Sequence, residues 1–204
     1  VVGSEPREGI YKYVHPHRLR LSGVFMEAKV WLKSKTRNDQ PIPFVIYARP
    51  RSGTTLLVNL LNQVQHLRCD GELLHDLILR PAGFLHDLAK RSGPETNAYG
   101  VKLLSYKLME VQRVTRPIAF FDRLSGMGYR VIHLTRETWA QNLSLVKAQH
   151  SGLYFGENQG PRDIEIDPEI FVKSLIWNAN MLDYENEVMQ FVDHMPICYD
   201  TDLK

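Results

Sequence analysis

The order of apolar and polar positions along the chain predicts strands and helices in alternation. Short apolar stretches predict strands, and the first of them, FVIYA, is apolar on both faces, as in the centre of a parallel sheet. Longer stretches with a helical pattern of apolar residues predict helices. The predicted strands lie at 44–48, 99–104, 129–136 and 196–200, and the predicted helices at 17–35, 53–65, 72–80, 82–91, 117–128, 137–149 and 168–193.

This alternation predicts an α/β fold of P-loop-like type, a three-layer sandwich with a mostly parallel central sheet of about four to five strands. We expect a single domain over 1–204, with a helical N-terminal extension over 1–41 and a core over 42–204 that is open to truncation at its C-terminal end. Parallel sheets bind ligands at the carboxyl ends of their strands. The places to search are the residues just after 48, 70, 104, 135 and 199.

Composition narrows the class of protein. The chain of 204 residues is 44% hydrophobic, which is enough for a substantial core. Its net charge of +2 makes no case for nucleic acid or a membrane surface as a partner. Without a transmembrane run of about 18 apolar residues or a signal peptide at the start, we expect a cytoplasmic protein. Cys69 and Cys198 are expected to be reduced thiols, which agrees with that compartment.

The stretch FVIYARPRSGTTLLVNLL, residues 44–61, passes from strand through a glycine turn into a helix. Nucleotide-binding folds hold phosphate at such turns, because the N–H groups at a helix start attract anions. The pattern G-x-x-x-x-G-K-[ST] is only partly met, since Ala48 and Thr54 replace its first glycine and its lysine. Only Gly53 and Thr55 fit. That lysine reaches the terminal phosphates of ATP, so its absence predicts a loop that grips a single phosphate.

Side chains around Gly53 add to the anion-binding character of the loop. Ser52, Thr54 and Thr55 carry hydroxyl groups, and Arg51 carries a guanidinium whose fork suits an oxyanion. The alternative is an ordinary helix cap beside an incidental arginine. A cap needs one hydroxyl, whereas three surround this glycine, so we favour the phosphate site.

The segment PRSGTTLL resembles the 5′-phosphosulfate loop of the sulfotransferases, which reads PKSGTTWL in cytosolic members and PRSGSTLL in some bacterial ones. These enzymes transfer a sulfuryl group from 3′-phosphoadenosine 5′-phosphosulfate (PAPS) to an alcohol or amine. The resemblance implies PAPS as cofactor, adenosine 3′,5′-bisphosphate as product, and no metal. The cofactor-binding residues that it implies in this loop are Arg49, Arg51, Ser52, Gly53, Thr54 and Thr55.

A second segment, VIHLTRETWAQNLSLVKA, resembles the family's 3′-phosphate motif, an arginine at a strand end followed by a serine eight residues on. Here Arg136 and Ser144 have that spacing, and both are implied to bind the cofactor. The alternatives are a surface arginine paired with Glu137 or Asp122 and a surface serine. The final ICYDTDLK resembles the family's V-x-Y-E-D-L strand exit, which adds Tyr199 to the implied cofactor site.

The general base of the family is sought next to the strand ends, since the acceptor hydroxyl must lose a proton. Lys102 stands where the family has a lysine, but Leu104 occupies the position of the histidine base of cytosolic members. Other branches use a glutamate in a G-E context, which implies Glu72 of CDGELLHD as the base. Its alternative is a helix-start glutamate. Lys102 and Arg51 are expected to act on the transferred group and complete the catalytic set, and His75 to orient Glu72 or the substrate.

The predicted function is transfer of a sulfuryl group to a small-molecule, carbohydrate or lipid acceptor. The pocket walls are expected from 75–98 and 150–165, including Phe84. No second carboxylate–histidine pair accompanies Glu72 and His75, so no metal is expected. Two alternatives stay open: a nucleoside or small-molecule kinase with a degenerate loop, and a non-catalytic nucleotide-binding protein. Nucleic acid is not an expected partner, and the pattern leaves the oligomeric state open.

Overall fold

The computed structural model describes residues 21–34, 41–151 and 165–203. Within them lies a five-stranded sheet of order β2-β3-β1-β4-β5, in which every neighbouring pair is parallel. The α/β prediction with a parallel sheet of four to five strands is therefore confirmed. The strands are β1 (Ile42–Ala48), β2 (Leu67–Glu72), β3 (Ala98–Leu104), β4 (Arg130–Thr135) and β5 (Met195–Cys198).

Strand β1 occupies the centre of the sheet because almost all of its side chains are apolar. Residues 44–48 are buried, and β1 pairs with β3 on one side and with β4 on the other. Its last residue, Ala48, lies level with Leu104 of β3 and Leu134 of β4. The carboxyl ends of three adjacent strands thus meet at one edge of the sheet.

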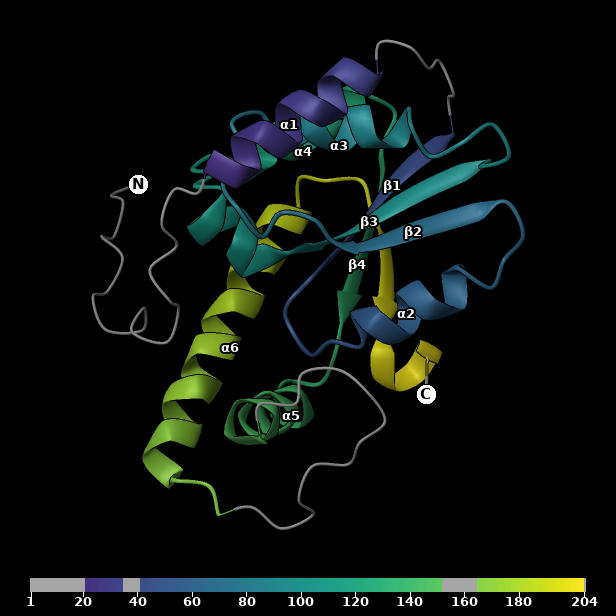
Figure 1. Ribbon diagram of the computed structural model, residues 1–204. Coiled ribbons are helices and arrows are strands. Elements are labelled where there is room, and N and C mark those ends of the chain that lie inside the picture. The colour runs from purple at the N-terminus through teal and green to yellow at the C-terminus, as the bar shows by residue number, and fades with distance from the viewer. Residues whose placement is uncertain (1–20, 35–40, 152–164, 204) are drawn as a thin grey trace.

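Helices cover both faces of the sheet and make three layers (Figure 1). On one face α1, α3, α4 and the end of α6 close a large apolar core with the strands, and on the other α2 packs over a smaller one. Helices α5 and α6 pack against each other. The helices are α1 (Leu21–Ser34), α2 (Thr54–Leu61), α3 (Pro81–Ala89), α4 (Pro117–Gly126), α5 (Thr138–Ser151) and α6 (Pro168–Met189), with π-helical turns η2 (Lys107–Val111) and η3 (Tyr199–Leu203).

The predicted helix at 72–80 is wrong. The chain leaves β2 at Glu72 and runs irregularly to Pro81, where α3 begins. Side chains from distant parts of the chain accept hydrogen bonds from its backbone N–H groups. The Ile78 N–H donates to Gln112 Oε1 at 3.0 Å, and the Leu79 N–H donates to Glu27 Oε2 at 3.0 Å. These distant partners replace the local bonds that a helix would need.

Other boundaries differ at the ends of the predicted elements. For β2 the sequence predicts only where the strand ends, near residue 70, and the structure places the strand at Leu67–Glu72. The last strand ends at Cys198, since Tyr199–Leu203 forms a π-helical turn. Both cysteines are free thiols. Among the described residues, none of the helices has the length and apolarity needed to cross a membrane.

We predict that Gly100→Ala destabilises the fold by about 1–3 kcal/mol, because overpacking a tight core forces side chains from their rotamers. Gly100 lies opposite Phe44 in the β1–β3 pair, and a Cβ at this position would lie 2.1 Å from the Phe44 ring. Chemical denaturation measures the loss. The matched control is Gly126→Ala at the end of α4, where a Cβ would meet nothing within 4 Å. Equal stability of the two variants would contradict the packing argument.

Candidate functional site

The loop between β1 and α2 has the backbone that the glycine turn predicts. Gly53 caps α2 with φ of 90°, a left-handed conformation that suits glycine, and no side chain caps the helix start. A Cβ on Gly53 would lie 2.2 Å from the ring of Tyr199. Arg51 is also left-handed, with φ of 64°, which is uncommon for a non-glycine residue. The loop is therefore a constrained turn that brings its backbone against the end of β5.

The three hydroxyl side chains of the loop differ in their exposure. Ser52 and Thr54 are buried, whereas Thr55 is exposed at the helix start. The Ser52 hydroxyl accepts a hydrogen bond from Nε2 of Gln141 at 3.1 Å, and the same nitrogen donates to the Pro50 carbonyl at 2.6 Å. Gln141 thus holds the loop from behind. Nothing in the sequence pattern singled it out, since a buried glutamine on a helix has no motif of its own.

Arg51, Arg136 and Ser144 converge on this loop, although 93 positions separate Arg51 from Ser144. Nε of Arg51 donates to the Ser144 hydroxyl at 3.1 Å, and Nη1 of Arg136 donates to the Arg51 carbonyl at 3.1 Å. The Arg136 guanidinium lies 4.4 Å from the centre of the Tyr199 ring. The structure therefore brings together Arg51, Gly53, Arg136, Ser144 and Tyr199, five residues that the sequence assigned to one cofactor site.

Arg49 lies apart from this group of side chains. It is fully buried behind the loop, with Nε 3.4 Å from a Glu185 carboxylate oxygen. It also donates to the carbonyls of Asn178 at 3.0 Å and Arg136 at 3.3 Å. Burial lowers the pKa of Arg49, and the charge of Glu185 opposes that shift. Its contacts with Glu185, Asn178 and Arg136 are those of a residue that anchors the loop.

A second cluster lies at the ends of β2 and β3 and surrounds Glu72 with cations. Lys102 Nζ lies 2.7 Å from Oε1 of Glu72, and Lys107 Nζ donates to Oε2. Lys107 also contacts Nδ1 of His75 at 2.7 Å. The cluster thus joins three predicted site residues to Lys107, which the sequence analysis missed. Lys107 follows β3 on η2, and a lone lysine there carries no motif.

The surroundings of Glu72 decide its charge. Burial by itself raises the pKa of this carboxyl, but the hydrogen bonds and charges of Lys102 and Lys107 outweigh burial and hold the pKa below its usual value. Glu72 is therefore ionised at neutral pH. Both of its oxygens face ammonium groups, so the cluster presents two cations and one anion at the carboxyl edge of the sheet.

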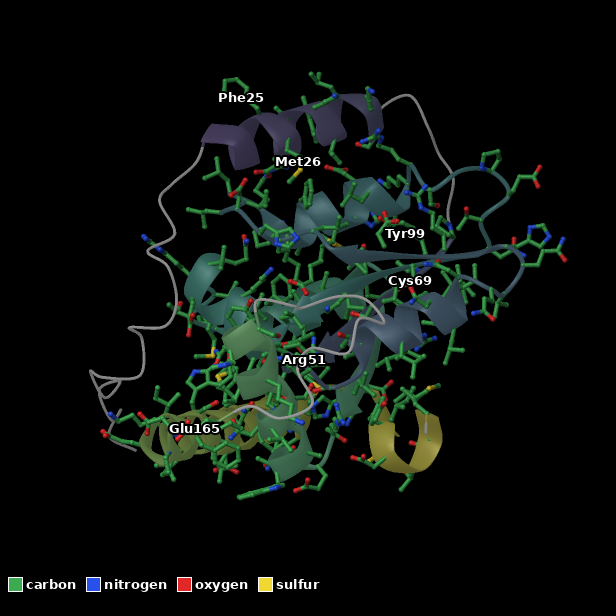
Figure 2. All side chains as sticks on the ribbon, turned by 60° about the horizontal axis from the view of Figure 1, so that its bottom comes forward. Phe25, Met26, Arg51, Cys69, Tyr99 and Glu165 are labelled. Atoms are coloured by element: carbon green, nitrogen blue, oxygen red, sulfur yellow. The ribbon has the colours of Figure 1, made fainter. Side chains whose placement is uncertain are left out.

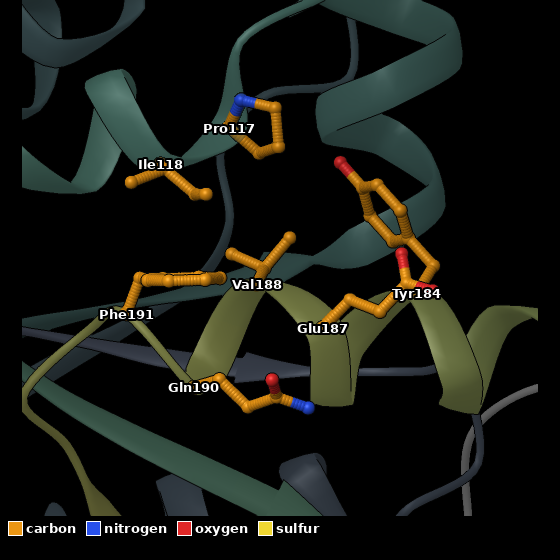
Figure 3. Close-up of a pocket in the computed structure, with 7 residues that line it drawn as sticks. All are labelled: Pro117, Ile118, Tyr184, Glu187, Val188, Gln190 and Phe191. Carbon is orange, nitrogen blue, oxygen red and sulfur yellow. The ribbon is translucent and has the colours of Figure 1, made fainter. Parts of the chain in front are cut away.

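A cavity of about 320 Å³ lies elsewhere, between the start of α4 and the end of α6 (Figure 3). None of the predicted site residues lines it. Of the predicted acceptor walls, Phe84 is wrong, because it is 1% exposed in the core beneath α3. Residues 152–164, which include most of the second predicted wall, lie outside the described residues.

The structure is an α/β protein in which a basic turn, with Arg51 and Arg136, lies at the carboxyl ends of the central strands. The chain is 37% identical over 122 residues to "Nodulation protein H" of Rhizobium tropici. That match covers 55% of this chain and 48% of the relative, so the chain spans about half the length of that protein. No protein-family model matches the chain.

We predict that Lys107→Met raises the pKa of Glu72, because one of the two cations that favour its ionised form is lost. In the wild type the folded-state pKa lies below the ordinary 4.5. The stabilisation by this carboxylate is therefore complete above pH 4.5 and is lost as the pH falls through the folded-state pKa. In the variant the folded-state pKa of Glu72 lies closer to the unfolded-state value, so the stabilisation is smaller and its loss is complete at a higher pH than in the wild type.

Carbon-13 NMR of the Glu72 carboxyl against pH measures the shift. Lys90→Met, on the surface beyond α3, serves as the control with the same change in net charge. Should Glu72 titrate alike in wild type and Lys107→Met, the contact with Lys107 does not set its charge.

Proposed function

We propose that this chain carries the catalytic domain of a PAPS-dependent sulfotransferase. The observation that supports it most is the convergence of Arg51, Arg136 and Ser144 on the Gly53 turn, from segments that the family uses for two different phosphates. The similarity to Nodulation protein H reported above favours the same family over a degenerate kinase. The match covers about half of each chain, so the activity and the substrate of this protein are proposed and rest on the site residues as well.

The chemistry of the side chains at the turn fits a nucleotide with two separate phosphate groups. Arg51 and the N–H groups at the start of α2 form one anion site, with the exposed Thr55 beside it. Arg136 and Ser144 form the second. Nε of Arg136 is buried and has no hydrogen-bond partner among the described residues, which leaves a donor for a phosphate oxygen.

Tyr199 gives the second site a wall. Its ring lies close to Gly53, and the Arg136 guanidinium lies 4.4 Å from the centre of the ring. These contacts restrict the orientation of the arginine. When bound, PAPS would supply the sulfuryl group and leave as adenosine 3′,5′-bisphosphate.

The cluster around Glu72 is proposed to serve the acceptor side of the reaction. Glu72, ionised and half-buried, takes the proton of the acceptor hydroxyl. Lys102 and Lys107 are positioned to neutralise charge that develops on the transferred group. A carboxylate held between two lysines is a weak base, so proton transfer is favoured once a lysine turns from Glu72 toward the sulfuryl group. His75 contacts Lys107 and is proposed to hold Lys107 in place, which leaves Lys102 as the lysine that turns.

If Arg136 and Ser144 bind a 3′-phosphate, adenosine 3′,5′-bisphosphate will raise the melting temperature of the protein more than AMP or ATP–magnesium. A ligand that binds only the folded state stabilises it by mass action. Loss of a charge-assisted phosphate contact costs about 1.5–3 kcal/mol, or roughly 10- to 100-fold in affinity. Arg136→Ala is expected to erase the preference while AMP affinity changes little.

A thermal-shift titration with the three nucleotides measures this preference. Arg123→Ala, which removes an exposed arginine on α4, is the matched control and keeps the wild-type pattern. A wild-type protein that prefers ATP–magnesium, or one that ignores the 3′-phosphate, would rule out the sulfotransferase and favour the kinase.

Glu72→Gln tests the base. The variant keeps the size of the side chain and removes its basicity, so sulfuryl transfer is expected to fall about 10²–10⁴-fold. Transfer of labelled sulfuryl from PAPS to a panel of sugars, lipids and alcohols provides the rate. Binding of the bisphosphate should stay near wild type, because Glu72 lies at β2 and not at the phosphate loop. Glu169→Gln on the exposed start of α6 is the control, and a wild-type rate in Glu72→Gln would transfer the role of base to His75.

A further inference from the structure

Helix α1 is docked on the domain through a polar face. Gly23 faces the backbone of the 72–80 segment so closely that a Cβ would lie 2.4 Å from the Leu77 carbonyl oxygen. The Glu27 carboxylate accepts from the Leu79 N–H and from Nε of Arg80, both at 3.0 Å. Ser34 donates to Asp87 on α3 at 3.0 Å. Together with the buried Val30, these residues recur every three or four positions and form the inward face of the helix.

The outward face of α1 is apolar, the reverse of the usual arrangement in a helix on a globular protein. Phe25 is 71% exposed and Leu32 62% exposed, seven residues apart and therefore on one side of the helix. Figure 2 shows Phe25 on the side of α1 that faces away from the body of the protein. Among the residues of this helix whose exposure is described (23 and 25–34), the exposed ones are Phe25, Met26, Ala28, Lys29, Trp31, Leu32 and Lys33.

The charges on this face all have one sign. Its charged residues are Lys29 and Lys33, and the one acidic residue of α1, Glu27, is turned inward to Arg80. Pairing α1 with α1 of a second copy would bring these lysines together with no carboxylate from the helix to oppose them. An anionic surface has the complementary charge. The small net charge of the whole chain hides this local excess.

We propose that the outward face of α1 binds to the surface of a membrane that contains anionic lipids. The outward face of the helix carries aromatic and aliphatic side chains flanked by lysines, which is the composition of helices that lie in the membrane interface. Phe25 and Leu32 enter the boundary between headgroups and acyl chains. Lys29 and Lys33 extend their ammonium groups to the lipid phosphates, with their aliphatic stems along the apolar surface.

Flotation of the whole chain with vesicles tests the proposal. The protein is expected to float with vesicles of phosphatidylcholine mixed with phosphatidylglycerol and to stay behind with phosphatidylcholine alone. Phe25→Ser with Leu32→Ser is expected to abolish flotation. Lys29→Gln with Lys33→Gln is expected to weaken binding to anionic vesicles roughly 25-fold at low salt, since each surface cation contributes about fivefold.

Phe191→Ser is the matched control, because Phe191 is 68% exposed and lies just beyond the C-terminal end of α6, outside α1. It should float like the wild type, and circular dichroism should show that every variant is folded. Quenching of wild-type tryptophan fluorescence by brominated lipid gives a readout that needs no variant, and it is expected only with anionic vesicles.

Three results would overturn the proposal: no flotation of the wild type with either vesicle, equal flotation with neutral vesicles, or loss of flotation in Phe191→Ser to the same degree. Analytical ultracentrifugation without lipid provides a further check. A dimer that disappears in Phe25→Ser with Leu32→Ser would assign the face to a second copy of the chain instead.

Discussion

The buried side chain of Arg49 is the contact on which the geometry of the site depends. It stands directly after the central strand, yet it reaches Glu185 on α6 and the carbonyls of Asn178 and Arg136. A buried charge is tolerated only when it is paired, and removal of one partner of such a pair typically costs about 3–5 kcal/mol. This arginine therefore ties β1, the end of β4 and α6 together at the point where the loop between β1 and α2 begins.

From this anchor follows the division of the loop into two sides. Its rear is occupied by Arg49 and by Gln141, which bonds to Pro50 and Ser52. Its front carries Arg51, Gly53 and the groups they meet. These rear contacts hold the left-handed turn and so fix the direction of its backbone N–H groups. The proposed phosphate binding would draw on this preorganisation, because donors that are already oriented stabilise charge most effectively.

Much of the fold followed from the sequence because its signals are local. The apolar run at 44–48, the glycine turn and the helical spacing of residues 54–61 are each set by neighbours in the chain, and the structure shows all three. The error at 72–80 has the opposite origin. That segment has a helical pattern of apolar residues. The side chains of Gln112 and Glu27, which are distant in the sequence, accept hydrogen bonds from its backbone N–H groups. Tertiary hydrogen bonds overrode a weak local preference.

The sequence by itself determined the α/β class and the glycine turn at Gly53, and the family resemblance of its motifs indicated that Arg136 and Ser144 lie beside that turn. These features can be read from the sequence because they depend on the types of residue at neighbouring or regularly spaced positions. Only the tertiary structure decided that Arg49 is an anchor, that Lys107 joins Lys102 beside Glu72, and that the apolar face of α1 points outward. These three facts depend on which distant side chains meet after folding. Burial and charge pairing, which set their roles, are properties of the packed molecule.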